Sequence, residues 1–297
     1  MLNKFAAKVF AAVVLMISSS FSWAITPYIQ AEKVKPAETA KVAAEVESKL
    51  KAAGFQVLGH YFPKQLSDYG VVVVSDEGIL NEVRELGGAN IVGAAIRVGV
   101  KSDGSVMYMN PDYWYRAYFR GQFGKAEKSV QAVQEKLARV LGAGMGFGGD
   151  ETAEELPKYR YIIGMERFDS DKNKLAEHVS FEQAVKTVRD NLAKGVAHTS
   201  KVYEVVMPDE KLAVFGVAMN DPVLGDAHWM KKIGAQDGVA SLPYELYVVN
   251  NTVGALYGRY RIALAYPNLS MGHFMRIVST PNEIMETLGA VAGAKKK

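Results

Sequence analysis

The sequence predicts an α+β protein with two similar lobes, each a curved antiparallel sheet backed by helices. Two stretches carry this prediction. Residues 244–267 (YELYVVNNTVGALYGRYRIALAYP) have the pattern of two strands joined by an Asn250-Asn251 turn. Residues 91–111 repeat that pattern around an Asp103-Gly104 turn, and each stretch ends beside a proline. We therefore expect one small fold to occur twice in the chain, with its copies related by a pseudo-two-fold axis.

The first lobe is predicted to span residues 25–141. Val42, Val46 and Leu50 lie at helical spacing, and Gly54 ends that helix. Four consecutive valines at 71–74 indicate a buried strand, and Asp76 is placed to cap the helix that follows. In chain order we expect a strand at 28–34, a helix at 37–53, strands at 55–62 and 71–75, a helix at 76–86, the first hairpin, an aromatic segment at 113–119 and a helix at about 125–141.

Residues 142–157 are predicted to be a linker, because five glycines precede an acidic cluster and Pro157. The glycines do not indicate a nucleotide site, since they follow a helix rather than a strand. The second lobe, 158–294, is expected to repeat the order of the first. Its predicted elements are a strand at 159–168, a helix at 180–192 capped by Ser180, strands at 201–207 and 211–219, a helix from 221 to 233, the second hairpin, and short helices from 271 and 281.

Composition limits the classes of function. The chain has 297 residues, 49% apolar and 23% charged, which is typical of a globular protein with two domains. The net charge is +3, and it falls to +1 without Lys4 and Lys8. No concentrated basic surface is predicted, so we expect no nucleic-acid partner, and residues 295–297 are interpreted as a basic tail. The absence of cysteine excludes disulfides, thiolate metal sites and covalent haem attachment, and no cofactor is predicted.

Residues 1–24 have the pattern of a signal peptide. Lys4 and Lys8 precede an apolar run at 9–17, and Ser22 and Ala24 are the small residues of a cleavage site after Ala24. The apolar run is shorter than the roughly 20 residues of a membrane-spanning helix. We therefore expect a periplasmic or secreted protein without an integral membrane segment after cleavage.

Several segments resemble the prokaryotic family called domain of unknown function 302. They are GFQVLGHY (54–61), GVVVVSDEGILNEVRELGG (70–88), IRVGVKSDGSVMYMNP (96–111), LPYELYVV (242–249) and YRIALAYPNLSMGHF (260–274). The resemblance implies two divergent copies of an α+β fold similar to that of the TATA-binding protein. It also implies pairing through the sheet, which members of the family tend to show. It implies no catalytic residue. The segment 113–119 and the last helix lie outside it.

The two hairpins suggest a site for an anionic ligand. Alternation along the strands places Arg97 and Lys101 on one sheet face, and Arg259 and Arg261 on a face of the second hairpin. A face of this kind is also typical of the solvated side of an antiparallel sheet. The functional hypothesis is a shared concave surface for a small anionic ligand or a protein partner, because the guanidinium group matches carboxylate and phosphate.

The segment 111–120 (PDYWYRAYFR) holds five aromatic residues and two arginines. Wound as a helix, it places Trp114 and Tyr118 on one face, and no single core face accommodates all five rings. The rings are therefore predicted to meet the other lobe, another subunit in a homodimer, or a ligand.

Two further hypotheses come from single side chains. A set of soft ligands would suit Cu(I); its members are His228, Met230, Met271, His273 and Met275. Methionines at helical spacing are more often core residues. Asp226 and His228 could form an acid–base pair in a small hydrolase or isomerase. The preferred function is an exported, non-enzymatic binding or accessory protein, with this enzyme as the alternative.

Overall fold

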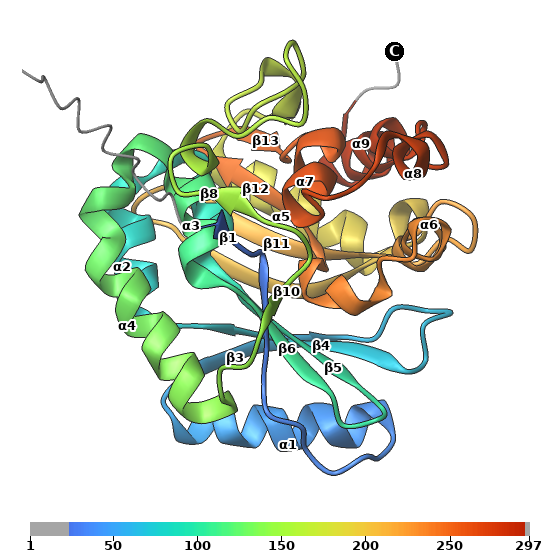
Figure 1. Cartoon of the computed structure of the whole chain (residues 1–297). Coiled ribbons are helices and arrows are strands. Elements are labelled where there is room, and N and C mark those ends of the chain that lie inside the picture. The colour runs from blue at the N-terminus through green and yellow to red at the C-terminus, as the bar shows by residue number, and fades with distance from the viewer. Residues whose placement is uncertain (1–23, 295–297) are drawn as a thin grey trace, which may run out of the picture.

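The computed structural model describes residues 24–294, and it contains two large antiparallel sheets and one small sheet (Figure 1). The predicted leader before Ala24 and the predicted tail lie outside the described residues. The first sheet has the order β3 (Gln56–Tyr61), β4 (Tyr69–Ser75), β5 (Ile96–Lys101), β6 (Val106–Met109), β2 (Tyr28–Gln30) and β7 (Gly146–Phe147). The second has the order β10 (Thr199–Met207), β11 (Leu212–Met219), β12 (Tyr244–Val249), β13 (Thr252–Gly254) and β9 (Lys174–Glu177). The small sheet pairs β1 (Ala24–Ile25) with β8 (Glu151–Thr152).

Helices back both large sheets, which confirms the predicted α+β class. In Figure 1 α1 lies beneath the first sheet, and the second sheet lies above the first. The helices are α1 (Thr39–Ala52), α2 (Glu77–Leu86), α3 (Pro111–Phe119), α4 (Phe123–Leu141), α5 (Phe181–Ala193), α6 (Asp226–Ile233), α7 (Gly258–Ala265), α8 (Met271–Met275) and α9 (Thr280–Ala292). The predicted caps are present: the Asp76 carboxylate accepts a hydrogen bond from Gly78 N at 2.9 Å, and Ser180 Oγ accepts one from Gln183 N at 3.2 Å. No helix among residues 24–294 is long and apolar enough to span a membrane.

The two large sheets share one strand order. The order β3-β4-β5-β6-β2 in the first sheet corresponds to β10-β11-β12-β13-β9 in the second, and every neighbouring pair is antiparallel. Each half also has a helix before its first edge strand, α1 or α5. Between the second and third strands of each order lie an α-helix and a 3₁₀ helix, namely α2 with η1 (Gly88–Ala94), and α6 with η6 (Gln236–Ser241). Within the predicted linker, β7 joins the first sheet and β8 pairs with β1.

The edge strands β3 and β10 lie against each other, and we call this contact the seam. Each strand has a β-bulge at the corresponding place, between Val57 and Gly59 in β3 and between Lys201 and Tyr203 in β10. A bulge interrupts the regular hydrogen-bonding edge of a strand. The two sheets meet at the seam without joining into one sheet, and each covers an edge of the other.

Three predicted elements were wrong. The second half of the predicted hairpin at 244–267 is the helix α7, and only β12 and β13 form the hairpin. Residues 159–168 form turns rather than a strand, because Tyr159 and Tyr161 donate hydrogen bonds to the carbonyls of Ala263 and Leu269 instead of pairing in a sheet. The helix predicted from 221 begins at Asp226, since the Asp221 side chain accepts hydrogen bonds within a preceding turn.

Candidate ligand pocket

Four of the predicted ligand-binding residues lie together in the interior. Arg97 and Arg261 both form ion pairs with Glu245, and the Arg261 Nε to Glu245 Oε2 distance is 3.2 Å. Their guanidinium carbons lie 5.0 and 4.8 Å from the ring centroid of Trp114. Tyr118 Oη accepts a hydrogen bond from Arg97 Nη2 at 3.3 Å. All of these side chains are buried, so in this conformation none of them reaches an external ligand.

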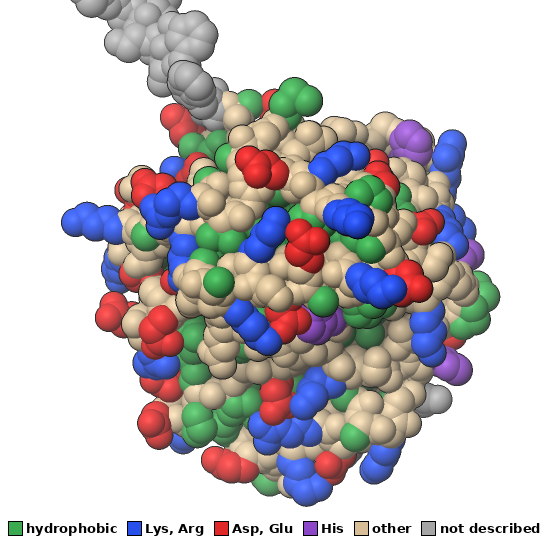
Figure 2. Space-filling view, turned by 90° about the horizontal axis from the view of Figure 1, so that it is seen from below, with side chains coloured by type: hydrophobic (Ala, Val, Ile, Leu, Met, Phe, Trp, Pro, Cys, Tyr) green, Lys and Arg blue, Asp and Glu red, His purple; other side chains and the backbone are tan. Residues whose placement is uncertain are grey.

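The other two predicted ligand-binding residues lie at separate places on the surface. Lys101 Nζ is 3.0 Å from Asp237 Oδ1, and Arg259 Nε is 3.1 Å from Glu166 Oε2. Each cation is therefore paired with a different carboxylate, and Glu166 also pairs with Lys172 Nζ at 2.7 Å. Figure 2 shows one face of the molecule, on which Lys and Arg side chains are interspersed with Asp and Glu rather than gathered in one region. Arg259 and Arg261 lie on α7, so the expected alternation of a strand does not apply to them.

The residues of the copper hypothesis lie on two helices. Met230 on α6 is buried, whereas Met271 and Met275 on α8 are about half exposed. His273 lies between them, and its Nδ1 is hydrogen-bonded to Ser270 Oγ at 2.9 Å. Because α8 is helical, Met271 and Met275 share a side and His273 projects from a different one. Among residues 24–294, no group of three or more His, Asp or Glu side chains is arranged to hold a metal ion.

A pocket of about 500 Å³ lies at one end of the seam, and we call it the seam pocket. Both halves of the chain line it. The lining residues are His60, Tyr61, Phe62, Lys64, Gly195, His198, Thr199, Ser200, Lys201, Val202, Ala218 and Asn220. They include four basic residues and no aspartate or glutamate. The other pockets described in residues 24–294 each include at least one acidic lining residue.

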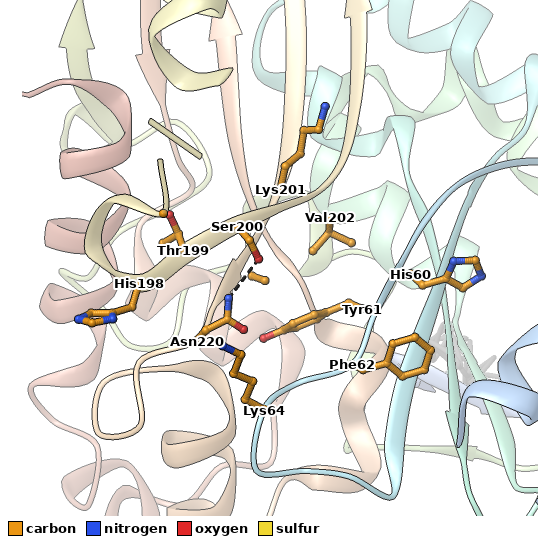
Figure 3. Close-up of a pocket in the computed structure, with 12 residues that line it drawn as sticks. His60, Tyr61, Phe62, Lys64, His198, Thr199, Ser200, Lys201, Val202 and Asn220 are labelled. Atoms are coloured by element: carbon orange, nitrogen blue, oxygen red, sulfur yellow. Dashed lines mark hydrogen bonds between the residues drawn. The ribbon is translucent and has the colours of Figure 1, made fainter. Parts of the chain in front are cut away.

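Four polar side chains face one another in the seam pocket (Figure 3). Tyr61 and Lys64 come from the first half, and Ser200 and Asn220 come from the second. Asn220 Nδ2 donates a hydrogen bond to Ser200 Oγ at 3.1 Å. Lys64 has no ion-pair partner in the described part of the chain. The arrangement supplies an ammonium group, an amide and two hydroxyl groups, which together can bind an anion or a polar ligand.

The remaining basic residues lie at the rim of the pocket and are directed outward. Because side chains alternate along a strand, His60 points away from the side of β3 that carries Tyr61 (Figure 3). Carboxylates outside the lining accompany these rim residues. Glu47 Oε2 is 2.7 Å from His60 Nε2, Asp221 Oδ2 is 3.8 Å from His198 Nε2, and Glu204 Oε2 is 3.1 Å from Lys201 Nζ.

A buried carboxyl group lies behind Tyr61. Asp226, the first residue of α6, is fully buried, and its Oδ2 accepts hydrogen bonds from Tyr61 Oη at 2.7 Å and from Met219 N at 3.2 Å. Its Oδ1 has no hydrogen-bond partner among the described residues. Burial raises the pKa of Asp226 to about 7. Asp226 is therefore bonded to Tyr61 across the seam, whereas the sequence had suggested a pairing with His228.

Comparison with known proteins gives no relative for this chain. No model of a protein family matches it, and neither the curated proteins nor the solved structures contain a match.

Sequence reasoning missed the lining of the seam pocket. Tyr61 and Lys64 are separated from Ser200 by more than 130 positions in the sequence, and no short motif marks either group. The one local signal was Asn220-Asp221-Pro222, which indicates a turn after a strand and so places Asn220 at a strand end.

Proposed function

We propose that this protein is a binding protein whose seam pocket holds a small anionic ligand. The observation that supports the proposal most is the Lys64 ammonium group, which has no ion-pair partner among residues 24–294 and faces Asn220 and Ser200 in a pocket that no carboxylate lines. Its volume of about 500 Å³ is within the range of small-molecule sites, which often lie between two domains. Both halves of the chain contribute lining residues, and this location between two sheets is typical of a ligand-binding site.

Lys64 is the residue most directly suited to the charge of the ligand. Its ammonium group faces Asn220 and Ser200, whose amide and hydroxyl groups can donate hydrogen bonds to a carboxylate or a sulfate (Figure 3). A hydrogen bond to a charged group contributes roughly 1.5–3 kcal/mol. Removing the ammonium group should therefore weaken the binding of an anion about tenfold or more.

The test compares anion binding by the wild type with binding by Lys64→Ala. We expect acetate, benzoate or sulfate to raise the melting temperature of the wild type, and Lys64→Ala to need at least tenfold more of the same anion. Lys128→Ala, which removes an exposed lysine on α4, is the matched control and should behave as the wild type. The proposal would be overturned if none of the three anions stabilised the wild type. It would also be overturned if Lys64→Ala responded to the anion as the wild type does.

Three further proposals concern the export and the origin of the chain. We propose that residues 1–24 direct export, that the two halves arose by duplication, and that each half is similar to domain of unknown function 302. The shared strand order of the two sheets supports duplication. Trypsin mapping and mass spectrometry of the protein from its native host test export, because cleavage after Ala24 would leave Ile25 as the first residue.

A further inference from the structure

We infer that Tyr61 donates a hydrogen bond to the bound anion only when Asp226 is protonated, so that ligand binding in the seam pocket takes up a proton. This inference rests on the proposed function. It assigns a new role to a pair of side chains that the two halves of the chain contribute separately. Tyr61 lies in the wall of the pocket, and Asp226 lies behind it, out of contact with solvent.

The number of protons at the contact between Tyr61 and Asp226 limits which hydrogen bonds the two side chains can make. A tyrosine hydroxyl has one proton to donate. When Asp226 is ionised it can only accept, so the Tyr61 proton is committed to Asp226 Oδ2, 2.7 Å away. When Asp226 is neutral, the proton of the carboxyl group needs an acceptor. Oδ1 has no partner, and Oδ2 is in contact with the donor Met219 N and with Tyr61 Oη, which can accept.

Protonation of Asp226 therefore reverses the direction of this hydrogen bond. The carboxyl group donates to Tyr61 Oη, and the Tyr61 proton is released to point into the pocket. The pocket thereby gains a donor and loses a negative charge behind its wall. Both changes favour an anion, so the same event acts on the ligand through hydrogen bonding and through electrostatics.

The surroundings of Asp226 place its titration in the range where such coupling is measurable. Its pKa is raised to about 7, chiefly because burial disfavours the charged form. The charged and titratable groups that act on it are Tyr61 on β3, Tyr244 on β12, Arg261 on α7 and Tyr266 after α7. All three phenols have a pKa raised above their ordinary value, so they stay neutral while Asp226 titrates.

The sign of the effect follows from linkage. Below about pH 7 Asp226 is protonated and the anion binds tightly. As the pH rises through 7, the carboxyl group ionises, recaptures the Tyr61 proton and repels the ligand. We expect affinity to fall about tenfold between pH 6 and pH 8.5. At pH 7, where about half of the free protein is protonated, binding should take up close to half a proton per ligand.

The experiment measures binding by isothermal titration calorimetry with whichever of acetate, benzoate and sulfate stabilises the wild type. None of these anions titrates between pH 6 and pH 8.5. Each titration is repeated in two buffers of different ionisation enthalpy, which gives the number of protons taken up. The wild type should show pH-dependent affinity and proton uptake at pH 7. Asp226→Asn should show neither, and its affinity should be independent of pH.

Two more variants keep the test decisive. Tyr61→Phe cannot donate to the ligand, so at pH 6 it should bind the anion more weakly than the wild type does. His198→Gln removes the imidazole at the rim of the pocket and should leave the proton uptake by Asp226 in place. If the wild type binds no anion at either pH, the proposed function fails. If it binds with a pH dependence that Asp226→Asn and Tyr61→Phe both retain, only the coupling to Asp226 is overturned.

Discussion

At the scale of single residues, the interior depends on one carboxylate. Glu245 is the carboxylate to which both Arg97 and Arg261 are paired, and all three side chains are buried. Glu245→Gln would leave two buried guanidinium groups without a negative charge. Losing one partner of a buried ion pair typically costs about 3–5 kcal/mol. We therefore expect the free energy of unfolding of Glu245→Gln, measured by urea denaturation, to fall by about that amount.

The surface pair of Arg189 and Glu204 provides the control. Its atoms lie 3.0 Å apart, but both side chains are partly exposed, and such pairs contribute about 0–1 kcal/mol. Glu204→Gln should therefore change the stability by less than 1 kcal/mol. Equal effects of the two substitutions would show that burial of Glu245 does not determine its contribution.

Residue patterns alone could not have revealed this cluster. Arg97 and Glu245 are 148 positions apart, and nothing near either residue in the sequence indicates its partner. The sequence did identify Arg97, Arg261, Trp114 and Tyr118 as unusual, and the structure brings these four together. It could not show whether a cation on a strand faces solvent or the interior, because alternation defines two faces without saying what covers each of them.

At the scale of elements, predictability depends on how a helix is buried. The helices α1 and α4 bury one face each, so their apolar residues recur at helical spacing and both were predicted. In α7 seven of the eight residues are buried, including Arg261. A helix covered on nearly all sides loses the 3.6-residue pattern, and its alternating tyrosines and aliphatic residues therefore imitated a strand.

The helix α3 gives a prediction at this scale. Its five aromatic side chains are all buried, and Tyr113 Oη donates a hydrogen bond to Leu264 O in α7 at 2.8 Å. The guanidinium carbons of Arg97 and Arg261 lie 5.0 and 4.8 Å from the Trp114 ring centroid, so Trp114→Ala would leave a large cavity beside buried charges. We expect it to lower the free energy of unfolding by about 3–5 kcal/mol. Chemical denaturation followed by far-ultraviolet circular dichroism measures this change.

A substitution at the surface is the control for Trp114. Ile163 is 85% exposed, and Ile163→Ala should change the stability by no more than about 0.5 kcal/mol. Because Trp114 does not line the seam pocket, a folded Trp114→Phe variant should bind anions as the wild type does. A loss of binding without a loss of stability would instead favour a ligand platform at α3.

At the scale of the whole molecule, the relation between the two halves decides where a ligand can bind. The seam joins an edge strand from each sheet, and the pocket exists only because these strands lie side by side. The sequence indicated two similar halves through their hairpins. It could not indicate which edges meet, since the bulges of β3 and β10 have no distinct sequence pattern and the contact joins segments far apart in the chain.

Gly59 tests the seam directly. An added Cβ at this position would overlap the carbonyl oxygen of Val202 in β10, a backbone atom that cannot rotate away. Gly59→Ala should therefore force β3 and β10 apart, lower the free energy of unfolding by about 1–3 kcal/mol and speed amide hydrogen exchange in both strands. Gly124→Ala in α4, where an added Cβ meets nothing within 4 Å, should instead be neutral or stabilising by up to about 1 kcal/mol.

Because Val202 also lines the seam pocket, the displaced strands should weaken anion binding in Gly59→Ala. Normal exchange in β10 together with unchanged binding would mean that other contacts hold the halves together, among them the ion pair of Arg97 with Glu245 and the hydrogen bond from Tyr113 to Leu264 O.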